Sequence, residues 1–444
     1  MISACRQAGK IARFAKAKPR RENLEFKIRM KVALIHDYLI RFGGAERVLL
    51  ELAKMFPEAP IYTFLYDQEK MGEWFSSERV RPSFLQKFPA FLRRRHKWLL
   101  PLMPIVPETF DLREFDLVIS SSSAFAKGVV VRPKTIHISY CHNAARFLWD
   151  YSAEYLNQQK LGFYRQILVD IIFNYLRLWD RSASKRVDYF VANSKATASR
   201  IKKYYNRDSK VIYPPVNLAA FDGSKNDFQK HKISPSDENF TRQADSLSVP
   251  QKQDGTMPTR QLERFENHIF LPLLVPKDYF LIVSQLTPYK KIDVAVEAFN
   301  KLGLPLIIIG EGSQKKYLQS IAKDNIKILG WLVDEETAEY YKNCFAFIFS
   351  GEDDFGIAPV EAMSWGKPVL ALCSGGARET VLPGMTGEFF EATTPEVLAD
   401  GVRRLRDNYK NYSPLVIRKW AEKFSTERFR QEFMEFVKKV GYSI

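Results

Sequence analysis

The chain has 444 residues, of which 46% are hydrophobic and 14% are aromatic. This composition excludes an intrinsically disordered protein, and the length exceeds what one average domain requires, so we expect two domains plus extensions. The formal net charge of +16 and the isoelectric point near 9.4 favour anionic partners, namely nucleotides, nucleic acid or acidic membrane surfaces.

Part of the positive charge lies in residues 1–29, which hold nine Lys or Arg and two Glu. The segment lacks the apolar core of a secretory signal peptide. Two interpretations remain open: an amphipathic basic arm, or a start codon assigned too early, with Met30 opening the first strand. We favour the second, and expect a basic N-terminal extension that is either not native or disordered.

Two further features concern the cellular compartment. No run approaches the roughly 20 apolar residues of a membrane-spanning helix. The cysteines have no paired spacing, which predicts neither a zinc site nor a disulfide framework and fits a reducing cytoplasm. They are Cys5, Cys141, Cys344 and Cys373.

In the first half of the chain, apolar strands alternate with helices, the pattern of a doubly wound parallel sheet. A helix is expected over 47–56, and Asn193 and Ser194 are expected to cap a basic helix around 198–205. These elements predict an N-terminal Rossmann-like domain over residues 30–215. Its expected strands are 31–36, 117–120, 136–140 and 189–192.

The same alternation returns in the second half and predicts a second Rossmann-like domain over residues 278–416. Between the two domains lies a polar stretch, 223–277, with little periodicity, which we interpret as an insertion or linker. The tail 417–444 is expected to be helical. The expected strands of the second domain are 279–284, 306–309, 326–329, 346–349 and, as the last, 369–372.

An acidic loop follows the strand 346–349 and leads into a short helix. Pro359 is expected at the first helical position, Glu361 in the first turn, and Gly366 at the end. Asp353 and Glu361 would then flank a helix N-terminus whose N–H groups suit an anionic ligand. Paired carboxylates can also hold sugar or ribose hydroxyls, because each accepts several hydrogen bonds. The plainer alternative is an ordinary helix cap.

This segment resembles the fingerprint of the retaining glycosyltransferases of family 4, in which two Glu residues, separated by seven others, surround a Phe-Gly pair. Here Asp353 stands at the first Glu position and Glu361 at the second. The resemblance runs from about Met30 to Phe424, with an interruption at 223–277. It is strongest to the mannosyltransferase-like branch that builds bacterial surface polysaccharides from GDP-mannose. The resemblance implies the GT-B fold: two Rossmann-like domains face a cleft, and the C-terminal helix crosses back to the acceptor-side first domain.

The resemblance assigns roles to the acidic loop and the start of its helix. Asp353 and the backbone of Phe355, Gly356 and Ile357 would face the donor sugar. Glu361 would hold the ribose of the nucleotide. The change from Glu to Asp at position 353 shortens the reach of this carboxylate by one methylene.

The loop after the strand 279–284 would bind the donor diphosphate. The resemblance places Lys290 there, with Lys291 beside it, whereas an exposed Lys is otherwise ordinary solvated surface. Relatives usually carry an Arg at the position of Gln285, so a bidentate grip on phosphate is lost. Either Lys291 compensates for this loss or the diphosphate is held more weakly than in relatives.

A Gly-Glu-Gly sequence at Gly310 and Gly312 raises the alternative of a dinucleotide-binding fingerprint. The third glycine of that fingerprint would fall at Lys315, so the sequence disfavours a dehydrogenase. By resemblance, this loop and Trp331 line the nucleotide pocket instead.

Two first-domain motifs complete the expected site. The loop with Gly43 and Gly44 resembles the family's glycine loop, which could abut the donor diphosphate and sugar, although two glycines also suit an ordinary turn. A second motif, His-x3-Arg-x2-Trp-Asp, begins at His142. The resemblance places His142 against the donor sugar and makes Arg146 a candidate for phosphate or acceptor contact. A single His is otherwise more often a structural residue.

Aromatic and basic residues are mixed over 88–103. Such a stretch can lie at the interface of an anionic membrane. A solvated turn over an ordinary core helix explains it nearly as well. Nucleic acid is not an expected partner, because no recognised nucleic-acid motif accompanies the positive charge.

We therefore expect a retaining, metal-independent transferase. It would move a hexose, with mannose favoured, from a nucleotide-diphosphate sugar to a hydroxyl of a lipid-linked or glycan acceptor in cell-surface polysaccharide synthesis. His142, Asp353 and Glu361 would orient sugar and ribose, while Lys290 and loop N–H groups would stabilise the departing diphosphate. No cofactor is expected besides the nucleotide sugar as substrate.

The expected location is the cytoplasm, with peripheral contact at the inner face of the membrane. Two alternatives come from other classes of protein. One is a nucleotide-sugar epimerase of GT-B fold, which would act without an acceptor. The other is a non-catalytic basic protein that binds membrane or nucleic acid.

Overall fold

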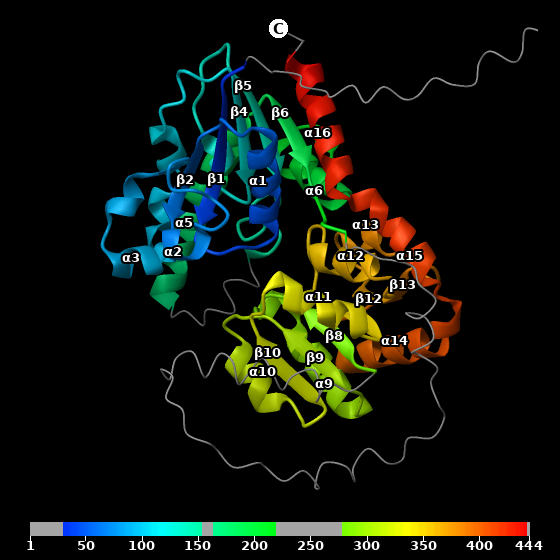
Figure 1. Cartoon of the computed structure of the whole chain (residues 1–444). Coiled ribbons are helices and arrows are strands. Elements are labelled where there is room, and N and C mark those ends of the chain that lie inside the picture. The colour runs from blue at the N-terminus through cyan, green and yellow to red at the C-terminus, as the bar shows by residue number, and fades with distance from the viewer. Residues whose placement is uncertain (1–29, 153–162, 219–277, 442–444) are drawn as a thin grey trace, which may run out of the picture.

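The computed structural model describes residues 30–152, 163–218 and 278–441. The chain forms two α/β domains, each built on one parallel sheet, and the C-terminal helix lies along the first domain (Figure 1). The predicted fold class, two Rossmann-like doubly wound domains of GT-B type, is confirmed. Two predicted segments, the basic extension 1–29 and the polar insertion 223–277, lie outside the described residues.

The first sheet has the strand order β3-β2-β1-β4-β5-β6-β7, and all neighbouring strands are parallel. The order reverses between β1 and β4, and ligands of such sheets bind beyond the carboxyl ends of the strands at that point. The strands are β1 Val32–Leu39, β2 Ile61–Tyr66, β3 Val80–Pro82, β4 Leu117–Ser122, β5 Ile136–Cys141, β6 Tyr189–Ala192 and β7 Ser209–Val211.

The helices of the first domain pack in separate hydrophobic clusters. Val48, Leu49 and Leu52 of α1 join one cluster with residues of β1, β4 and β5. Phe173 and Leu176 of α5 join another. The helical segments are α1 Gly44–Met55, α2 Gln68–Met71, η1 Phe84–Lys87, α3 Ala90–Arg94, η2 His96–Leu102, η3 Val106–Thr109, η4 Ala126–Gly128 and α5 Phe163–Ser184.

The basic helix after β6 begins at the predicted cap. Ser194 Oγ accepts a hydrogen bond from the Thr197 N–H at 3.0 Å, which satisfies one of the free donors of the first turn. Two segments occupy the helix expected around 198–205, namely α6 (Lys195–Arg200) and the π-helical turn η5 (Ile201–Tyr205).

The second sheet has the order β10-β9-β8-β11-β12-β13. The expectation that the strand 369–372 is the last is wrong, because Gly387–Phe390 pairs with it in parallel as β13. This edge strand is short and opens with a Gly and a Glu, so it lacks the apolar run that marks a buried strand. The other strands are β8 Phe280–Val283, β9 Leu306–Ile309, β10 Ile326–Gly330, β11 Ala346–Phe349 and β12 Val369–Leu372.

Helices separate the strands of the second domain and surround a single large core cluster. They are η7 Pro288–Lys290, α9 Ile292–Leu302, α10 Lys315–Ile321, α11 Asp334–Asn343, α12 Ile357–Ser364, α13 Ala377–Thr380, α14 Pro395–Asp407 and η8 Tyr409–Asn411.

The C-terminal tail joins the two domains. Its first helix, α15 (Pro414–Ala421), packs against α12 of the second domain. After the turn η9 (Glu422–Phe424), the last helix, α16 (Thr426–Gly441), buries Phe429 and Phe433 in the first-domain cluster that also holds α1. The tail is therefore two helices with a turn between them, where the sequence suggested one helical stretch. In the part of the chain that the structure describes, no helix is both long and apolar enough to cross a bilayer.

Candidate active site

The acidic loop after β11 leads into α12, and Gly356 determines where that helix begins. Gly356 has φ 85°, a left-handed conformation that glycine adopts without a steric cost, and α12 starts at the next residue, Ile357. Pro359 is therefore the third helical residue and Glu361 lies in the second turn, which corrects the expected first position and first turn. Proline is compatible with the third position because the N–H groups of the first turn have no partner within the helix.

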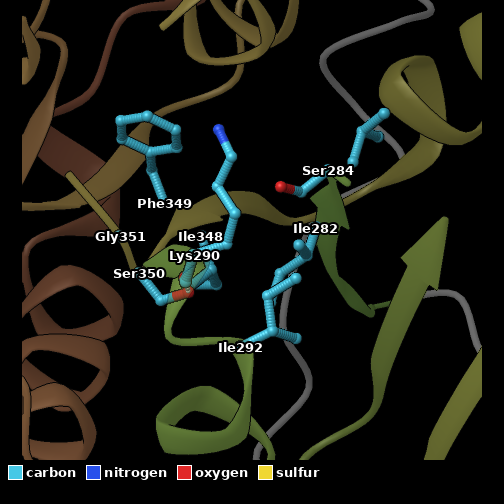
Figure 2. Close-up of a pocket in the computed structure, with 9 residues that line it drawn as sticks. Ile282, Ser284, Lys290, Ile292, Ile348, Phe349, Ser350 and Gly351 are labelled. Atoms are coloured by element: carbon cyan, nitrogen blue, oxygen red, sulfur yellow. Dashed lines mark hydrogen bonds between the residues drawn. The ribbon is translucent and has the colours of Figure 1, made fainter. Parts of the chain in front are cut away.

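Asp353 forms an ion pair with Lys290, whose ammonium donates to both carboxylate oxygens. Burial alone would lower the pKa of Lys290, but the charge of Asp353 and its hydrogen bond outweigh burial and raise the pKa. Figure 2 shows Lys290 standing above a small pocket at the ends of β8 and β11, whose lining includes Ile282 and Ile348. Two predicted donor residues are thus in direct contact, and the cation stays charged.

Gly310 and Gly312 bring their loop against the backbone of the segment that precedes Lys290. A Cβ atom on Gly310 would stand 1.8 Å from the Ser284 carbonyl oxygen, and one on Gly312 would stand 2.2 Å from the Leu286 carbonyl oxygen. Both contacts are too close for any side chain, so these glycines are required by packing between two loops. That packing determines the position of the loop that carries Lys290.

Other predicted donor residues of the second domain have different surroundings. Trp331 follows β10 and is 62% exposed. The side chain of Phe355 is buried and its ring packs against Tyr213 and Phe424, so only its backbone is available for the predicted contact with the sugar. Lys291 has φ 51° and is the residue that precedes α9.

Glu361 receives contacts from both domains. Its Oε2 accepts a hydrogen bond from the Tyr341 hydroxyl at 3.0 Å, and its Oε1 lies 3.8 Å from a guanidinium nitrogen of Arg47 in α1. Arg47 also pairs with Asp334 at 2.9 Å. One first-domain arginine thus reaches two acidic residues of the second domain. Sequence reasoning did not single out Arg47 or Tyr341, although Arg47 follows the glycine loop directly.

The glycine loop itself meets the second domain. A Cβ atom on Gly44 would lie 3.1 Å from Cδ1 of Ile357, and one on Gly43 would lie 3.8 Å from Nε2 of Gln285. Gly43 is the residue that precedes α1. The structure therefore brings together four of the predicted donor residues from opposite domains at the place where the two domains face each other.

His142 is buried at the end of β5 and belongs to a chain of polar contacts. Its Nε2 lies 2.7 Å from Ser121 Oγ, and the same Oγ lies 3.1 Å from Nδ1 of His36. The other ring nitrogen of His36 lies 3.3 Å from Oε1 of Glu46 in the first turn of α1. Burial, with a smaller contribution from His36, lowers the pKa of His142 to about 3. His142 is therefore a neutral hydrogen-bonding group at ordinary pH.

Arg146 makes ion pairs with the second domain. It contacts Glu352 at 2.8 Å and Asp354 at 3.8 Å, on either side of Asp353. A second arginine, Arg200 at the end of α6, contacts the same two carboxylates, with 2.8 Å to Glu352. Burial raises the pKa of Asp354 to about 6, although both arginines oppose that rise. In this structure the charge of Arg146 is engaged by carboxylates, and the role of Arg200 was not anticipated from the sequence.

Each of the three acidic residues 352–354 thus pairs with a cation. Two of these cations, Arg146 and Arg200, belong to the first domain, and the third, Lys290, belongs to the second. Such a row of paired charges can bind an anionic ligand only where the ligand competes with a carboxylate for its cation. Among the residues that the structure describes, no group of three or more His, Cys, Asp or Glu is arranged to hold a metal ion.

Two family models match the chain. One, described as Glycosyltransferase Family 4, matches residues 42–220, and the other, described as Glycosyl transferases group 1, matches residues 264–418. The two matches correspond to the two domains of the structure.

Similarity to curated proteins is partial for some and nearly complete for others. A glycosyltransferase of Methanocaldococcus jannaschii is 28% identical over 34% of this chain and 45% of its own length, so less than half of that relative is matched. The alpha-1,3/1,6-mannosyltransferase ALG2 of Dictyostelium discoideum is 25% identical over 93% of this chain and 98% of its own length. ALG2 of Saccharomyces cerevisiae is 24% identical over 92% of this chain and 84% of its own length.

Solved structures resemble this one along nearly the whole chain. HepE of Anabaena, in complex with UDP-glucose, matches with a TM-score of 0.59 at 16% identity, covering 92% of this chain and 100% of that chain. Sucrose-phosphate synthase of Thermosynechococcus elongatus matches with a TM-score of 0.61 at 14% identity, and the match covers 94% of this chain and 100% of that chain. At such identities the likeness demonstrates a shared fold.

Proposed function

Because the chain belongs to the family 4 glycosyltransferases, we propose that it transfers a hexose from a nucleotide-diphosphate sugar to a hydroxyl of a lipid-linked or glycan acceptor. Mannose is the favoured sugar, because the ALG2 mannosyltransferases align with nearly the whole chain. GDP-mannose is accordingly the first donor to test. The product would be a cell-surface polysaccharide or its lipid-linked precursor.

The observation that carries this proposal is the contact between predicted donor residues from both domains. Lys290 and Asp353 form one ion pair, and Gly44 faces Ile357 across the domain boundary. We infer that the donor diphosphate takes the place of Asp353 beside Lys290, because phosphate is the more highly charged partner for the ammonium. Glu361 would accept hydrogen bonds from the ribose hydroxyls.

The proposed transfer proceeds with retention at the anomeric carbon. The acceptor oxygen forms a bond to C1 of the sugar, the bond from C1 to the diphosphate oxygen breaks, and the acceptor proton passes to the departing phosphate. Lys290 and nearby backbone N–H groups would stabilise the charge that develops on the diphosphate. Neutral His142 would donate or accept a hydrogen bond at a sugar hydroxyl, and so would contribute by positioning. No metal ion is required in this scheme.

We further infer a cytoplasmic location at the inner face of the membrane. Three cysteines lie within the described residues and all are free thiols, namely Cys141, Cys344 and Cys373. Free thiols fit a reducing compartment. A lipid-linked acceptor would be reached at the membrane surface.

A donor screen tests the proposed function. The purified protein is heated with GDP-mannose, UDP-glucose, UDP-N-acetylglucosamine or the corresponding nucleoside diphosphates, because a ligand that binds the folded state raises the melting temperature. One nucleotide sugar should raise it, and an added acceptor extract should accelerate release of the nucleoside diphosphate. Conversion of the sugar nucleotide without any acceptor would indicate an epimerase instead. No response to any nucleotide sugar would refute the proposal.

A further inference from the structure

The helix α5 carries apolar residues on two faces, and the side chains on one of these faces are exposed. Phe173 and Leu176 are buried in one hydrophobic cluster with Leu99 and Met103. A second stripe recurs at intervals of three, four and seven residues, which places its members on one side of the helix. These six side chains are between 44% and 85% exposed: Tyr164, Ile167, Leu168, Ile171, Tyr175 and Leu178. A contiguous apolar surface of this kind on a folded domain marks a site of interaction.

The segment 90–105, which contributes Leu99 and Met103 to this cluster, has exposed apolar residues of its own. Phe91 and Trp98 are 60% and 63% exposed, and the guanidinium of Arg95 lies 4.9 Å from the centre of the Trp98 ring. Residues 79–107 contain seven Lys or Arg and neither Asp nor Glu. Lys87 and Arg95 of this stretch are exposed, so positive charge lies in the same segment as the exposed aromatic side chains.

We propose that α5 and the segment 90–105 form a docking surface for an anionic lipid bilayer. The apolar stripe of α5, with Phe91 and Trp98, would enter the boundary between headgroups and acyl chains. The exposed side chains of Lys87 and Arg95 would meet the anionic headgroups. The sequence alone suggested membrane contact only for the stretch 88–103. The apolar stripe of α5 could be recognised only from the structure, which shows which side of this helix is buried.

Charge favours a bilayer over a second copy of the chain as the occupant. In a two-fold symmetric dimer the same patch faces itself, so the acid-free segment 79–107 would lie against its own like charges. A bilayer with anionic lipids offers the opposite charge to this segment. None of the docking residues belongs to the candidate active site, so the inference does not rest on the proposed reaction.

Vesicle sedimentation of the full-length protein tests the proposal. The wild type should bind vesicles of phosphatidylcholine with about one-third phosphatidylglycerol, and bind pure phosphatidylcholine vesicles at least about tenfold more weakly. Ile171→Asp with Leu178→Asp should weaken binding to the anionic vesicles at least about tenfold. The matched control is Tyr317→Asp with Leu415→Asp, two exposed apolar residues of the second domain, and it should bind like the wild type.

Two further measurements separate the outcomes. Lys87→Ala with Arg95→Ala should reduce the preference for anionic vesicles, while the melting temperature of every variant should match the wild type. If a variant is unfolded, Ile171→Ser with Leu178→Ser replaces it. Absence of wild-type binding, or equal binding by the α5 variant, would overturn the proposal. So would a wild-type dimer that the α5 variant converts to a monomer, because the stripe would then be a self-interface. The vesicle result is independent of any donor binding.

Discussion

Glu379 of the second domain caps a helix of the first domain at Lys195. Its two carboxylate oxygens accept hydrogen bonds from the backbone N–H groups of Lys195 and Ala196 at 2.9 and 3.0 Å, and the Tyr213 hydroxyl donates to the same group at 3.1 Å. A negative charge at a helix N-terminus is favourable because the unpaired N–H groups there carry partial positive charge. Glu379 thereby links the two domains beside the row of acidic residues 352–354.

Removal of this cap should destabilise the chain. We expect Glu379→Ala to lower the free energy of unfolding by about 1 kcal/mol, because two donors lose their acceptor. The free energy of unfolding of Glu379→Gln should lie between those of Glu379→Ala and the wild type, because Gln keeps a hydrogen-bond acceptor and loses the negative charge. Urea unfolding measures both, with Glu435→Ala on the exposed side of α16 as control. An unchanged midpoint for Glu379→Ala would show that the cap contributes nothing.

Lys290 should be the most sensitive cation of the site. We expect Lys290→Met to lower kcat/KM for the nucleotide sugar by at least about 10², or about 2.7 kcal/mol of transition-state stabilisation. Lys301→Met, which breaks an exposed ion pair with Glu396 in the same domain, is the matched control and should retain wild-type activity. Steady-state release of nucleoside diphosphate gives both values. Wild-type rates for Lys290→Met would remove this residue from the site.

Asp353 should behave differently from Lys290 if the diphosphate displaces its carboxylate. Asp353→Asn leaves Lys290 without a competing anion, so we expect tighter binding of the nucleoside diphosphate together with a lower kcat. Isothermal titration and kinetics separate the two effects. Weaker diphosphate binding in this variant would contradict the proposed exchange of partners at Lys290.

Glu361 and Tyr341 offer a test of direct and positioning roles. Glu361→Ala should lower kcat/KM by at least about 10² through loss of ribose contacts. Tyr341→Phe removes only the hydroxyl that orients Glu361, so we expect a rise of about three- to tenfold in KM for the donor with kcat little changed. Tyr340→Phe on the same helix is the control. An equal loss of kcat in Tyr341→Phe would argue against a positioning role.

Stability should depend on pH through two buried histidines. Burial lowers the pKa of His142 to about 3 and that of His137 to about 4, whereas an unfolded histidine titrates near 6.5. Between these values the unfolded state binds more protons, so the stability present above about pH 6.5 is lost as the pH falls towards 4. The loss amounts to as much as about 1.4 kcal/mol per pH unit for each histidine.

His142→Asn isolates one of these contributions. Asp354 acts in the opposite direction, because its raised pKa of about 6 favours the folded state on acidification, and it is present in both proteins. The difference between the urea unfolding midpoints at pH 7.5 and at pH 5 should be smaller for His142→Asn than for the wild type. Equal differences would indicate that His142 is protonated in the folded state.

Much of the fold could be predicted because its signals are local. The buried strands β9 and β11 are continuous apolar stretches, β1 opens with four apolar residues, and the Ser194 cap is set by residues within one turn. The edge strand β13 was missed because a four-residue edge strand with Gly and Glu has no such run. The start of α12 was misplaced by two residues because it depends on the conformation of Gly356 and not on the residue types of the first turn.

In the candidate site, too, the residues within short sequence motifs could be predicted, whereas those defined by contacts between distant segments could not. The resemblance identified Lys290, Asp353 and Glu361, which lie in motifs a few residues long. It did not identify Arg200 or Glu379, whose partners across the domain boundary lie more than 150 residues away in sequence. It also made Arg146 a candidate for phosphate or acceptor contact, which stays a prediction, and in the structure the Arg146 guanidinium pairs with Glu352.

The amino-acid sequence by itself determined the two parallel sheets, the family and the short motifs at the strand ends, since apolar periodicity and turn residues act over a few positions. Tertiary structure alone decided which charges meet across the two domains and which face of α5 is exposed. Ion pairs and exposed surfaces depend on how distant segments approach one another in space, and no local pattern encodes that approach.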